Sequence, residues 1–298
     1  MSSDKTSTTA YTVATGLAKL SELPRWKSYF TSDMIFLNRA FMQHAKDTLE
    51  KRMIGWLTPE LMIRVMDTIY IPGMTEHYLF RKCWIEGHLT DAIINGAQQV
   101  IVLGAGLDTL ALRSAKKHDA VTFFEIDLPT TQNTKIHILQ QIGYAVPDNC
   151  HLKAADLGKT VLDAVLLPDH HFRPDASTVI ILEGVLMYLT EAEVKSLFLD
   201  INRLFTGQLL IFYGAISAPD GKYNAVVRFT SALLRRGTEG TKWHCTGELM
   251  SGFMAELGYN IKEWISYKDL QRRYRKEAEL GQIPEQDENY YIVTKRAQ

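Results

Sequence analysis

Hydrophobic residues follow two different periods along the chain, and the change falls near residue 97. Before it, apolar residues recur at spacings of three and four, as between Phe36 and Phe41, which predicts amphipathic helices. The tripeptide at 58–60, Thr-Pro-Glu, is typical of a helix start with proline in the first turn. We therefore expect residues 1–96 to form a helical cap or lid.

From residue 97 onward, short apolar runs alternate with amphipathic segments, which predicts successive βα units. The expected strands are Gln99–Leu103, Ala120–Ile126, His151–Ala155, Thr178–Leu182, Leu209–Tyr213, Asn260–Ser266 and Tyr290–Thr294. The expected helices between them are Leu107–His118, Thr130–Ile142 and Glu191–Phe205. This pattern predicts an α/β fold for residues 97–298, a Rossmann-like core around a mainly parallel seven-stranded sheet.

Two local features refine this picture. Thr190 is followed three residues later by Glu193, which predicts a capping box at the start of the helix there. Residues 217–242 break the alternation of strands and helices, and this predicts an insertion beside the functional site.

Composition and charge narrow the class of protein. Hydrophobic residues make up 46% of the 298 and charged residues 22%, which is ordinary for a globular domain. The formal net charge of -1 provides no broad positive field for a nucleic acid or an anionic membrane, so we expect neither as a partner.

The cysteines bear on whether the protein binds a metal, and the first residues bear on where in the cell it is found. Cys83, Cys150 and Cys245 are widely spaced and form no CxxC pair, so we expect reduced thiols and no metal site. Residues 1–10 are polar, and no run of about 18 apolar residues occurs. A cytoplasmic protein is the expectation.

The first expected strand runs into a glycine turn and then a helix, the place where open α/β sheets bind ligands. Gly104 and Gly106 would let the backbone approach a nucleoside closely, although a purely structural turn would look the same. A dinucleotide fold favours a third glycine where Thr109 stands. Asp108 in the first helical turn complements the helix dipole and would repel a diphosphate. S-adenosylmethionine, a nucleoside with no phosphate, fits better.

Acidic residues follow three of the first four expected strands. Asp127 ends the second strand about 20 residues past the glycines, where an acid can accept hydrogen bonds from ribose hydroxyls, and Glu125 is the second choice. Asp156 and Glu183 follow the third and fourth strands and could accept hydrogen bonds from the adenine amine and the cofactor's ammonium. The alternative is structural, with these acids capping helices or pairing with Arg113.

At this point the chain resembles the leucine carboxyl methyltransferase family. Its members include phosphatase carboxyl methyltransferases and bacterial small-molecule O-methyltransferases. The resemblance runs from about Arg81 to Gly258 and rests on four motifs. They are GAGLDTLALR at 104–113, FFEIDLP at 123–129, DL at 156–157 and EGVLMYL at 183–189. The resemblance implies a class I methyltransferase fold with S-adenosylmethionine as the cofactor.

The resemblance also implies roles for single residues. Arg81 matches the family arginine that binds the methionine carboxylate, for which a guanidinium can donate two parallel hydrogen bonds. The other matches are Gly104 in the cofactor loop, Asp127 as the ribose acid, Asp156 and Leu157 at the adenine, and Glu183 near the methionyl end.

The chain departs from the family pattern at two places. The family's basic cofactor-binding residue near the N-terminus has no clear match in residues 10–19, so no cofactor contact is assigned there. Phosphatase methyltransferases have an arginine after the DL pair, where this chain has Gly158, and this departure bears on the acceptor of the methyl group. The resemblance is therefore closer to the small-molecule branch, and protein C-terminal carboxyl methylation is the alternative.

We therefore expect an in-line transfer of a methyl group to a carboxylate or hydroxyl of a small molecule, such as a polyketide-like or other secondary metabolite. A hydroxyl acceptor would need a general base, and Tyr188 and His244 are the candidates. Two other classes remain open: an NAD-dependent oxidoreductase, opposed by Asp108, and a non-catalytic protein that keeps the fold. The sequence does not predict an oligomeric state.

Overall fold

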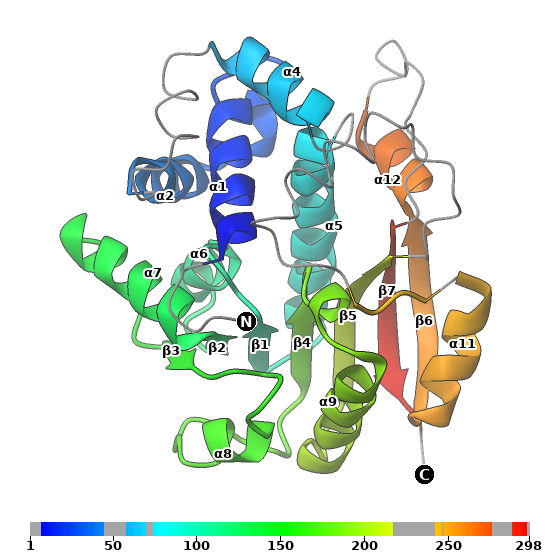
Figure 1. Cartoon of the computed structure of the whole chain (residues 1–298). Helices are drawn as coiled ribbons and strands as arrows, with labels where there is room; N and C mark the ends of the chain where they lie inside the picture. Colours follow the sequence, from blue (N-terminus) through cyan, green and yellow to red (C-terminus); the bar gives the residue numbers. More distant parts are fainter. Residues whose placement is uncertain are drawn as a thin grey trace.

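A seven-stranded sheet forms the centre of the molecule, and helices cover both of its faces (Figure 1). The computed structural model describes residues 7–44, 58–69, 74–216, 242–245, 247–275 and 288–296. The strands are β1 Gln99–Leu103, β2 Thr122–Asp127, β3 Cys150–Ala154, β4 Thr178–Leu182, β5 Leu209–Ile216, β6 Tyr259–Ser266 and β7 Glu288–Lys295. Their order across the sheet is β3-β2-β1-β4-β5-β7-β6.

The sheet is mainly parallel, which confirms the predicted fold class. Strands β1 to β5 all pair in parallel. Strand β7 is antiparallel to both of its neighbours, β5 and β6. Every residue of β1 and β4 is buried, as expected for parallel strands that are covered on both faces.

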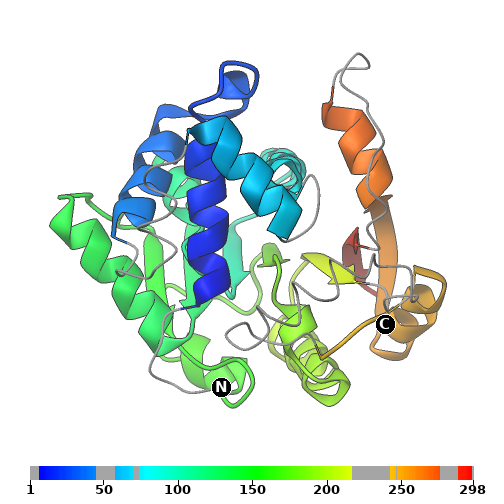
Figure 2. The ribbon, with the colours of Figure 1, turned by 45° about the horizontal axis from the view of Figure 1, so that its top comes forward.

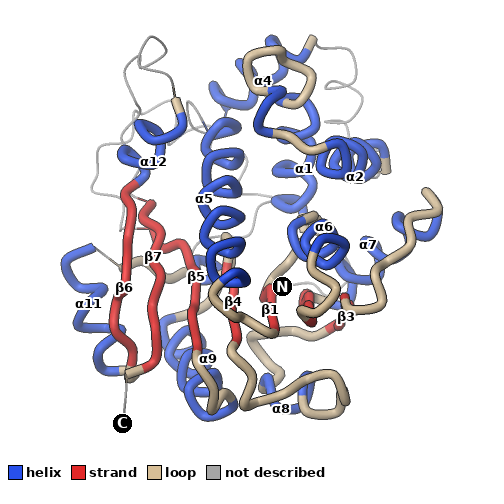
Figure 3. Tube along the Cα trace, turned by 180° about the vertical axis from the view of Figure 1, so that it is seen from behind, coloured by secondary structure: helices blue, strands red, loops and turns tan. Residues whose placement is uncertain are grey.

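Alternate residues of the central strands pack into two separate cores. In β1, Val100 and Val102 belong to one core, and Ile101 and Leu103 belong to the other. The first core contains side chains of α5 Met74–Ile94, α6 Leu110–Lys117, α7 Pro129–Gln141 and α12 Tyr267–Tyr274. The second contains side chains of α8 Leu162–Leu166, α9 Glu191–Leu204 and α11 Gly247–Glu256. Figure 3, seen from behind, shows α5 and α6 in front of the strands.

The described residues before β1 form helices joined by turns and contain no strand, as predicted. It contains α1 Thr8–Leu20, the short 3-10 turn η1 Lys27–Tyr29, α2 Ser32–Gln43, α4 Pro59–Ile69 and α5. Helices α1, α2 and α4 stand beyond one end of the sheet, and α1 and α4 come to the front when the molecule is tilted (Figure 2).

The core of this helical region continues into the core of the sheet. Leu17 of α1 and Phe41 of α2 belong to the same cluster of buried residues as Trp84 of α5 and Val179 of β4. The division into a cap at 1–96 and a core at 97–298 stays a prediction, and α5 packs against both parts.

Two predicted helix starts are confirmed. Helix α4 begins at Pro59, and the Thr58 hydroxyl accepts a hydrogen bond from the amide of Leu61. At the start of α9, Thr190 and Glu193 form both hydrogen bonds of a capping box.

The structure corrects the predicted bounds of five strands, β2, β3, β5, β6 and β7. Strand β5 continues to Ile216 and β7 begins at Glu288, because these two residues pair with each other across the sheet. Residues 217–241 of the predicted insertion lie outside the described residues. Within the described parts of the chain, no helix is long and apolar enough to cross a membrane.

Candidate cofactor site

The loops that follow β1, β2, β3 and β4 line one cavity at the carboxyl edge of the sheet, with a volume of about 190 Å³. This is the edge at which open α/β sheets bind ligands. Side chains from α5, from the 3-10 turn η2 Leu186–Tyr188 and from α1 complete the wall. The residues used below are Arg81, Lys82, Gly104, Gly106, Asp108, Asp127, Asp156, Leu157, Glu183 and Tyr188, all of which line it.

The glycine turn after β1 has a backbone that a side chain would disrupt. Gly104 and Gly106 have φ angles of 68° and 53°, in the left-handed region that favours glycine. A Cβ atom at Gly104 would lie 2.3 Å from a methyl carbon of Val185, and one at Gly106 would lie 3.2 Å from the Cβ of Ala10. A larger residue at either position would therefore strain the backbone or clash with a neighbour at the floor of the cavity.

Asp127 braces this turn from the end of β2. Its Oδ2 accepts a hydrogen bond of 2.6 Å from the amide of Gly106, and its Oδ1 accepts one of 2.7 Å from the amide of Leu128. Burial raises the pKa of this carboxyl, and the two backbone donors oppose the rise. Each carboxylate oxygen has a further lone pair, so Asp127 can hold the turn and still accept hydrogen bonds from a ligand.

The structure does not bring Glu125 to the cavity. Glu125 is fully buried, and its carboxylate pairs at 2.5 Å with Lys135 of α7. Lys135 also donates to the backbone carbonyl of Asp108. Strand alternation does put Glu125 on the same face as Asp127, but the position nearer the middle of the strand lies below the cavity.

Asp108 lies just before α6, two residues ahead of its first residue Leu110, and not in the first helical turn as predicted. Its Oδ1 accepts hydrogen bonds from the amides of Thr109 and Leu110, at 2.6 and 3.3 Å, and pairs with Lys82 Nζ at 3.0 Å. Burial alone would raise the pKa of this carboxyl, but Lys82 lowers it to about 2. A permanently charged carboxylate therefore occupies the place that a diphosphate would need.

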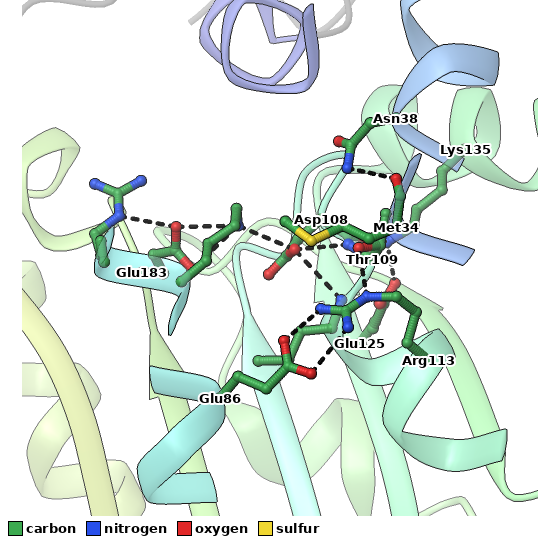
Figure 4. A network of polar contacts seen from close by, with 12 residues as sticks. Met34, Asn38, Glu86, Asp108, Thr109, Arg113, Glu125, Lys135 and Glu183 are labelled. Atoms are coloured by element: carbon green, nitrogen blue, oxygen red, sulfur yellow. Dashed lines mark hydrogen bonds and ion pairs between the residues drawn. The ribbon is translucent and has the colours of Figure 1, made fainter. Parts of the chain in front are cut away.

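A chain of ion pairs runs along the back of the cavity from Glu183 through Lys82 to Asp108 (Figure 4). Arg81 Nε donates to Glu183 Oε1 at 2.8 Å, and Lys82 Nζ donates to the same carboxylate at 3.1 Å. All of these side chains are at most about a tenth exposed. The cavity therefore has two buried cations beside three acids, counting Asp127.

Arg113 does not form its ion pair with Asp127 or Glu125. Its guanidinium donates to both carboxylate oxygens of Glu86, at 2.9 and 2.7 Å, and to the hydroxyl of Thr109 (Figure 4). The structural alternative, in which Arg113 pairs with Asp127 or Glu125, is therefore not the arrangement observed.

The loop after β3 brings Asp156, Leu157 and Gly158 to the cavity wall. Asp156 is partly exposed, and its Oδ1 accepts a hydrogen bond of 3.1 Å from the amide of Gly158. A Cβ atom at Gly158 would lie 3.3 Å from Glu193 Oε1 and 3.4 Å from Asp156 Oδ1. The position that carries an arginine in phosphatase methyltransferases thus faces two carboxylates here.

The structure separates the two candidate general bases. Tyr188 lines the cavity, and its hydroxyl donates to Thr9 Oγ1 of α1 at 3.3 Å. His244 is half-buried after the undescribed segment and is not one of the residues that line this cavity.

Several lining residues were missed by the sequence analysis. They are Lys82 on α5, Asn38 on α2, and Ser7, Thr9, Ala10, Val13, Ala14 and Leu17 on or beside α1. Lys82 adjoins Arg81, and that proximity was a usable signal. The residues of α1 and α2 carry no local signal, because only the packing of these helices over the sheet edge brings them to the cavity.

The residues present fit S-adenosylmethionine. A guanidinium suits a carboxylate, an acid that ends β2 suits ribose hydroxyls, and acids near the methionyl end suit an ammonium and a sulfonium. The two glycines leave room for close approach, and Asp108 disfavours a phosphate. Together, a glycine turn flanked by acids and a sheet with β7 antiparallel between β5 and β6 define the class, that of the class I S-adenosylmethionine-dependent methyltransferases.

Comparison with known proteins gives the family. A family model described as leucine carboxyl methyltransferase matches residues 28–202, more than half of the chain, and the chain belongs to this family. Among solved structures, a provisionally named methyltransferase from Thermobifida fusca has the same fold. Its TM-score is 0.60 at 14% identity, over 99% of this chain and 97% of that one.

Related sequences have names that agree with this class. YktD of Bacillus subtilis, provisionally named as an S-adenosyl-L-methionine-dependent methyltransferase, is 35% identical over 43% of this chain and 40% of its own length. A protein of Mycobacterium marinum with the same provisional description is 28% identical over 63% of this chain and 59% of its own. The chain thus spans about half the length of the curated relatives it matches.

Proposed function

We propose that this protein transfers a methyl group from S-adenosylmethionine to an oxygen of a small molecule. The observation that carries the proposal is the cavity at the carboxyl edge, where two glycines, Asp127, Asp156, Glu183 and Arg81 converge. When bound, the cofactor supplies a methyl group on a positively charged sulfur, which an attacking oxygen displaces in line.

The chain's own residues would bind and orient the cofactor. Arg81 would bind the carboxylate of the methionyl end, and Glu183 its ammonium. Asp127 would accept hydrogen bonds from the ribose, while Asp156 and Leu157 would contact the adenine. Most of the rate enhancement would come from positioning, which can contribute about 7 to 11 kcal/mol in well-aligned systems.

The surroundings of Gly158 support a small acceptor over a protein C-terminus. Hydrogen bonds from Thr190 lower the pKa of Glu193, so this acid is ionised beside Gly158. The Glu193 carboxylate there would repel the terminal carboxylate of a protein substrate, which phosphatase methyltransferases hold with an arginine at this position, and the neighbouring Asp156 pairs with Lys159 at 3.0 Å.

Tyr188 is the better placed of the two candidate bases, because it lines the cavity. It would orient a hydroxyl acceptor or remove its proton, whereas a carboxylate acceptor needs no base. Tyr188→Phe should lower kcat for a hydroxyl acceptor and leave cofactor affinity within about twofold, whereas a role of His244 predicts the same for His244→Gln.

The helices before β1 would form a cap over the cofactor. Ala10 lies against Gly106, and Thr9 accepts the hydrogen bond of Tyr188, so residues of α1 form part of the cavity wall. Closing such a lid excludes water from the transfer.

Calorimetric titration with S-adenosylmethionine and S-adenosylhomocysteine tests the cofactor. The parent should bind both ligands. Asp127→Asn should weaken both by about 10- to 150-fold, because a hydrogen bond to a charged group is worth about 1.5 to 3 kcal/mol. Asp119→Asn makes the same charge change at an exposed position and should bind as the parent does.

Failure of the parent to bind either ligand would overturn the proposal, and equal binding by Asp127→Asn would remove the ribose assignment. The acceptor needs a separate assay of methyl transfer to small hydroxyl and carboxyl compounds. A leucine-terminated peptide in the same assay covers protein carboxyl methylation, and its methylation in preference to the small compounds would contradict our interpretation of Gly158.

A further inference from the structure

A buried polar cluster joins Arg81 to three residues that the proposed reaction does not use. It consists of His77 and Arg81 on α5 and Glu288 and Tyr290 on β7, with exposed fractions of 0%, 6%, 7% and 1%. Removing charged side chains from water is costly unless they are well paired. A cluster of this kind therefore calls for a structural or functional reason.

The secondary structure brings the four side chains together. His77 and Arg81 are four residues apart on α5, so they lie on one face of the helix, and Glu288 and Tyr290 alternate onto one face of β7. On the neighbouring strand, Gly214 pairs with Tyr290. A Cβ atom at Gly214 would lie 2.9 Å from the Tyr290 ring and 3.2 Å from Glu288 Oε1. Glycine in the middle of β5 thus makes room for the cluster.

Glu288 contacts Arg81 with one oxygen and is held through the other. Arg81 Nη1 lies 3.5 Å from Glu288 Oε1, and His77 Nε2 lies 2.7 Å from Glu288 Oε2. Tyr290 places its hydroxyl 2.5 Å from the same His77 nitrogen. Burial alone would raise the pKa of Glu288, but His77 and Arg81 lower it to about 2, so this acid is ionised.

These contacts determine the tautomer of His77 and the orientation of Glu288. An ionised carboxylate can only accept hydrogen bonds, so His77 Nε2 carries the hydrogen and donates it to Glu288. Burial lowers the pKa of His77, which favours the neutral ring. Glu288 therefore cannot turn away from Arg81 without losing a buried hydrogen bond.

Arg81 is in turn held between two acids from different elements. Glu183 after β4 takes its Nε at 2.8 Å, and Glu288 at the start of β7 faces its Nη1. Gly184 lies beside the guanidinium, where a Cβ atom would be 3.8 Å from Nη2. Neither of these two hydrogen bonds involves Nη2, and Arg81 lines the cavity.

We propose that Glu288, held by His77 and Tyr290, is a positioning residue that aims the guanidinium of Arg81 at the carboxylate of the cofactor's methionyl end. This inference rests on the proposed function. Two-sided fixation matters because an arginine donates two parallel hydrogen bonds to a carboxylate only when its plane is correctly oriented. Glu288 itself does not touch the ligand.

The competing explanation is that the cluster only stabilises the fold. A pair of ligands separates the two. S-adenosylhomocysteine carries the amino-acid end with its carboxylate, whereas 5′-methylthioadenosine has the same nucleoside without that end. Loss of orientation at Arg81 affects the first ligand alone, while general damage to the cavity affects both.

The experiment measures both affinities by calorimetry for the parent, Glu288→Gln, His77→Leu and His77→Gln. Glu288→Gln and His77→Leu should weaken S-adenosylhomocysteine about tenfold or more, in line with the loss of a charged hydrogen bond. Both should leave methylthioadenosine within about twofold. His77→Gln keeps an N–H donor near the position of Nε2 and should restore most of the affinity. Glu256→Gln, an exposed glutamate on α11, is the matched control.

The possible outcomes are distinct. Equal weakening of both ligands, unchanged binding of S-adenosylhomocysteine by Glu288→Gln, or tighter binding would each overturn the positioning role. Tighter binding would mean that Glu288 competes with the cofactor for Arg81. A parent that binds neither ligand would instead refute the proposed function. If Glu288→Gln does not fold, Tyr290→Phe removes one hydroxyl without changing charge and should weaken only S-adenosylhomocysteine, by a smaller factor.

Discussion

Asp108 joins the opening of α6 to the ion pairs of α5. It accepts hydrogen bonds from two backbone amides and pairs with Lys82, which also contacts Glu183. One side chain therefore stabilises a helix start, holds a buried lysine and places negative charge at the cavity. Its removal should be visible both in stability and in the dependence of stability on pH.

The Asp108→Asn variant should lower the free energy of unfolding at pH 7. Because the pKa of Asp108 in the folded protein is about 2, below its ordinary value of 3.8, its contribution is present above about pH 4. That contribution is lost as the pH falls toward 2. Urea unfolding at a series of pH values should therefore show a shallower acid loss for the variant than for the parent. Parallel curves for the two proteins would contradict the assignment, and Asp119→Asn is the control.

The acids of the cavity were predictable because of where they fall in the sequence. Asp127, Asp156 and Glu183 each follow a strand, and parallel strands end at one edge of a sheet. The position of Glu125 was harder to predict. Strand alternation shows which face of the sheet a side chain lies on, but it does not show which positions along the strand a helix will cover. Lys135, ten residues further on, pairs with Glu125 from α7, and no local pattern indicates that contact.

At the scale of elements, the close packing of β5 against β7 depends on Gly214. Gly214→Ala should destabilise the protein by about 1 to 3 kcal/mol, since the new methyl group would overlap buried side chains of β7. Chemical denaturation of parent and variant measures the difference. A neutral or stabilising effect would show that β7 can shift away from β5 at no cost.

Helix α5 offers the opposite case. Gly87 lies in its interior and is exposed, and a Cβ atom there would meet nothing within 4 Å. Gly87→Ala should therefore raise the free energy of unfolding by about 0.5 to 1 kcal/mol, because alanine loses less backbone entropy in a helix. A loss of stability in the same denaturation assay would be inconsistent with an open helix surface at this position.

Most elements were predictable from hydrophobic period, and the exceptions have physical reasons. The run at 290–294 is apolar, so it indicated a strand, but Glu288 and Asn289 are polar and join β7 only through antiparallel pairing with β5. The placement of β7 between β5 and β6 is a matter of long-range pairing, which a periodicity cannot show. The packing of α1 against the glycine turn could not be predicted from the sequence for the same reason.

For the molecule as a whole, ligand binding should stabilise both the sheet edge and the cap. At a concentration about 100 times Kd, S-adenosylhomocysteine should raise the free energy of unfolding by about 2.7 kcal/mol, whereas NAD should have no effect. Amide hydrogen exchange should slow in α1, whose residues line the cavity. A melting temperature raised by NAD alone would favour an oxidoreductase, and unchanged exchange in α1 would argue against a lid.

The position of β7 also sets an order of assembly. Strand β6 is made before β7, yet β7 is its only partner among the described strands, so β6 cannot join the sheet until β7 has been synthesised and inserted. Arg81 and Glu288 are 207 residues apart in the chain. Contacts of such long range form late and slow the folding of a domain. The nascent chain therefore carries Arg81 through most of translation without one of its two acids. If Glu288 orients Arg81 as proposed, tight cofactor binding is acquired only once β7 has joined the sheet.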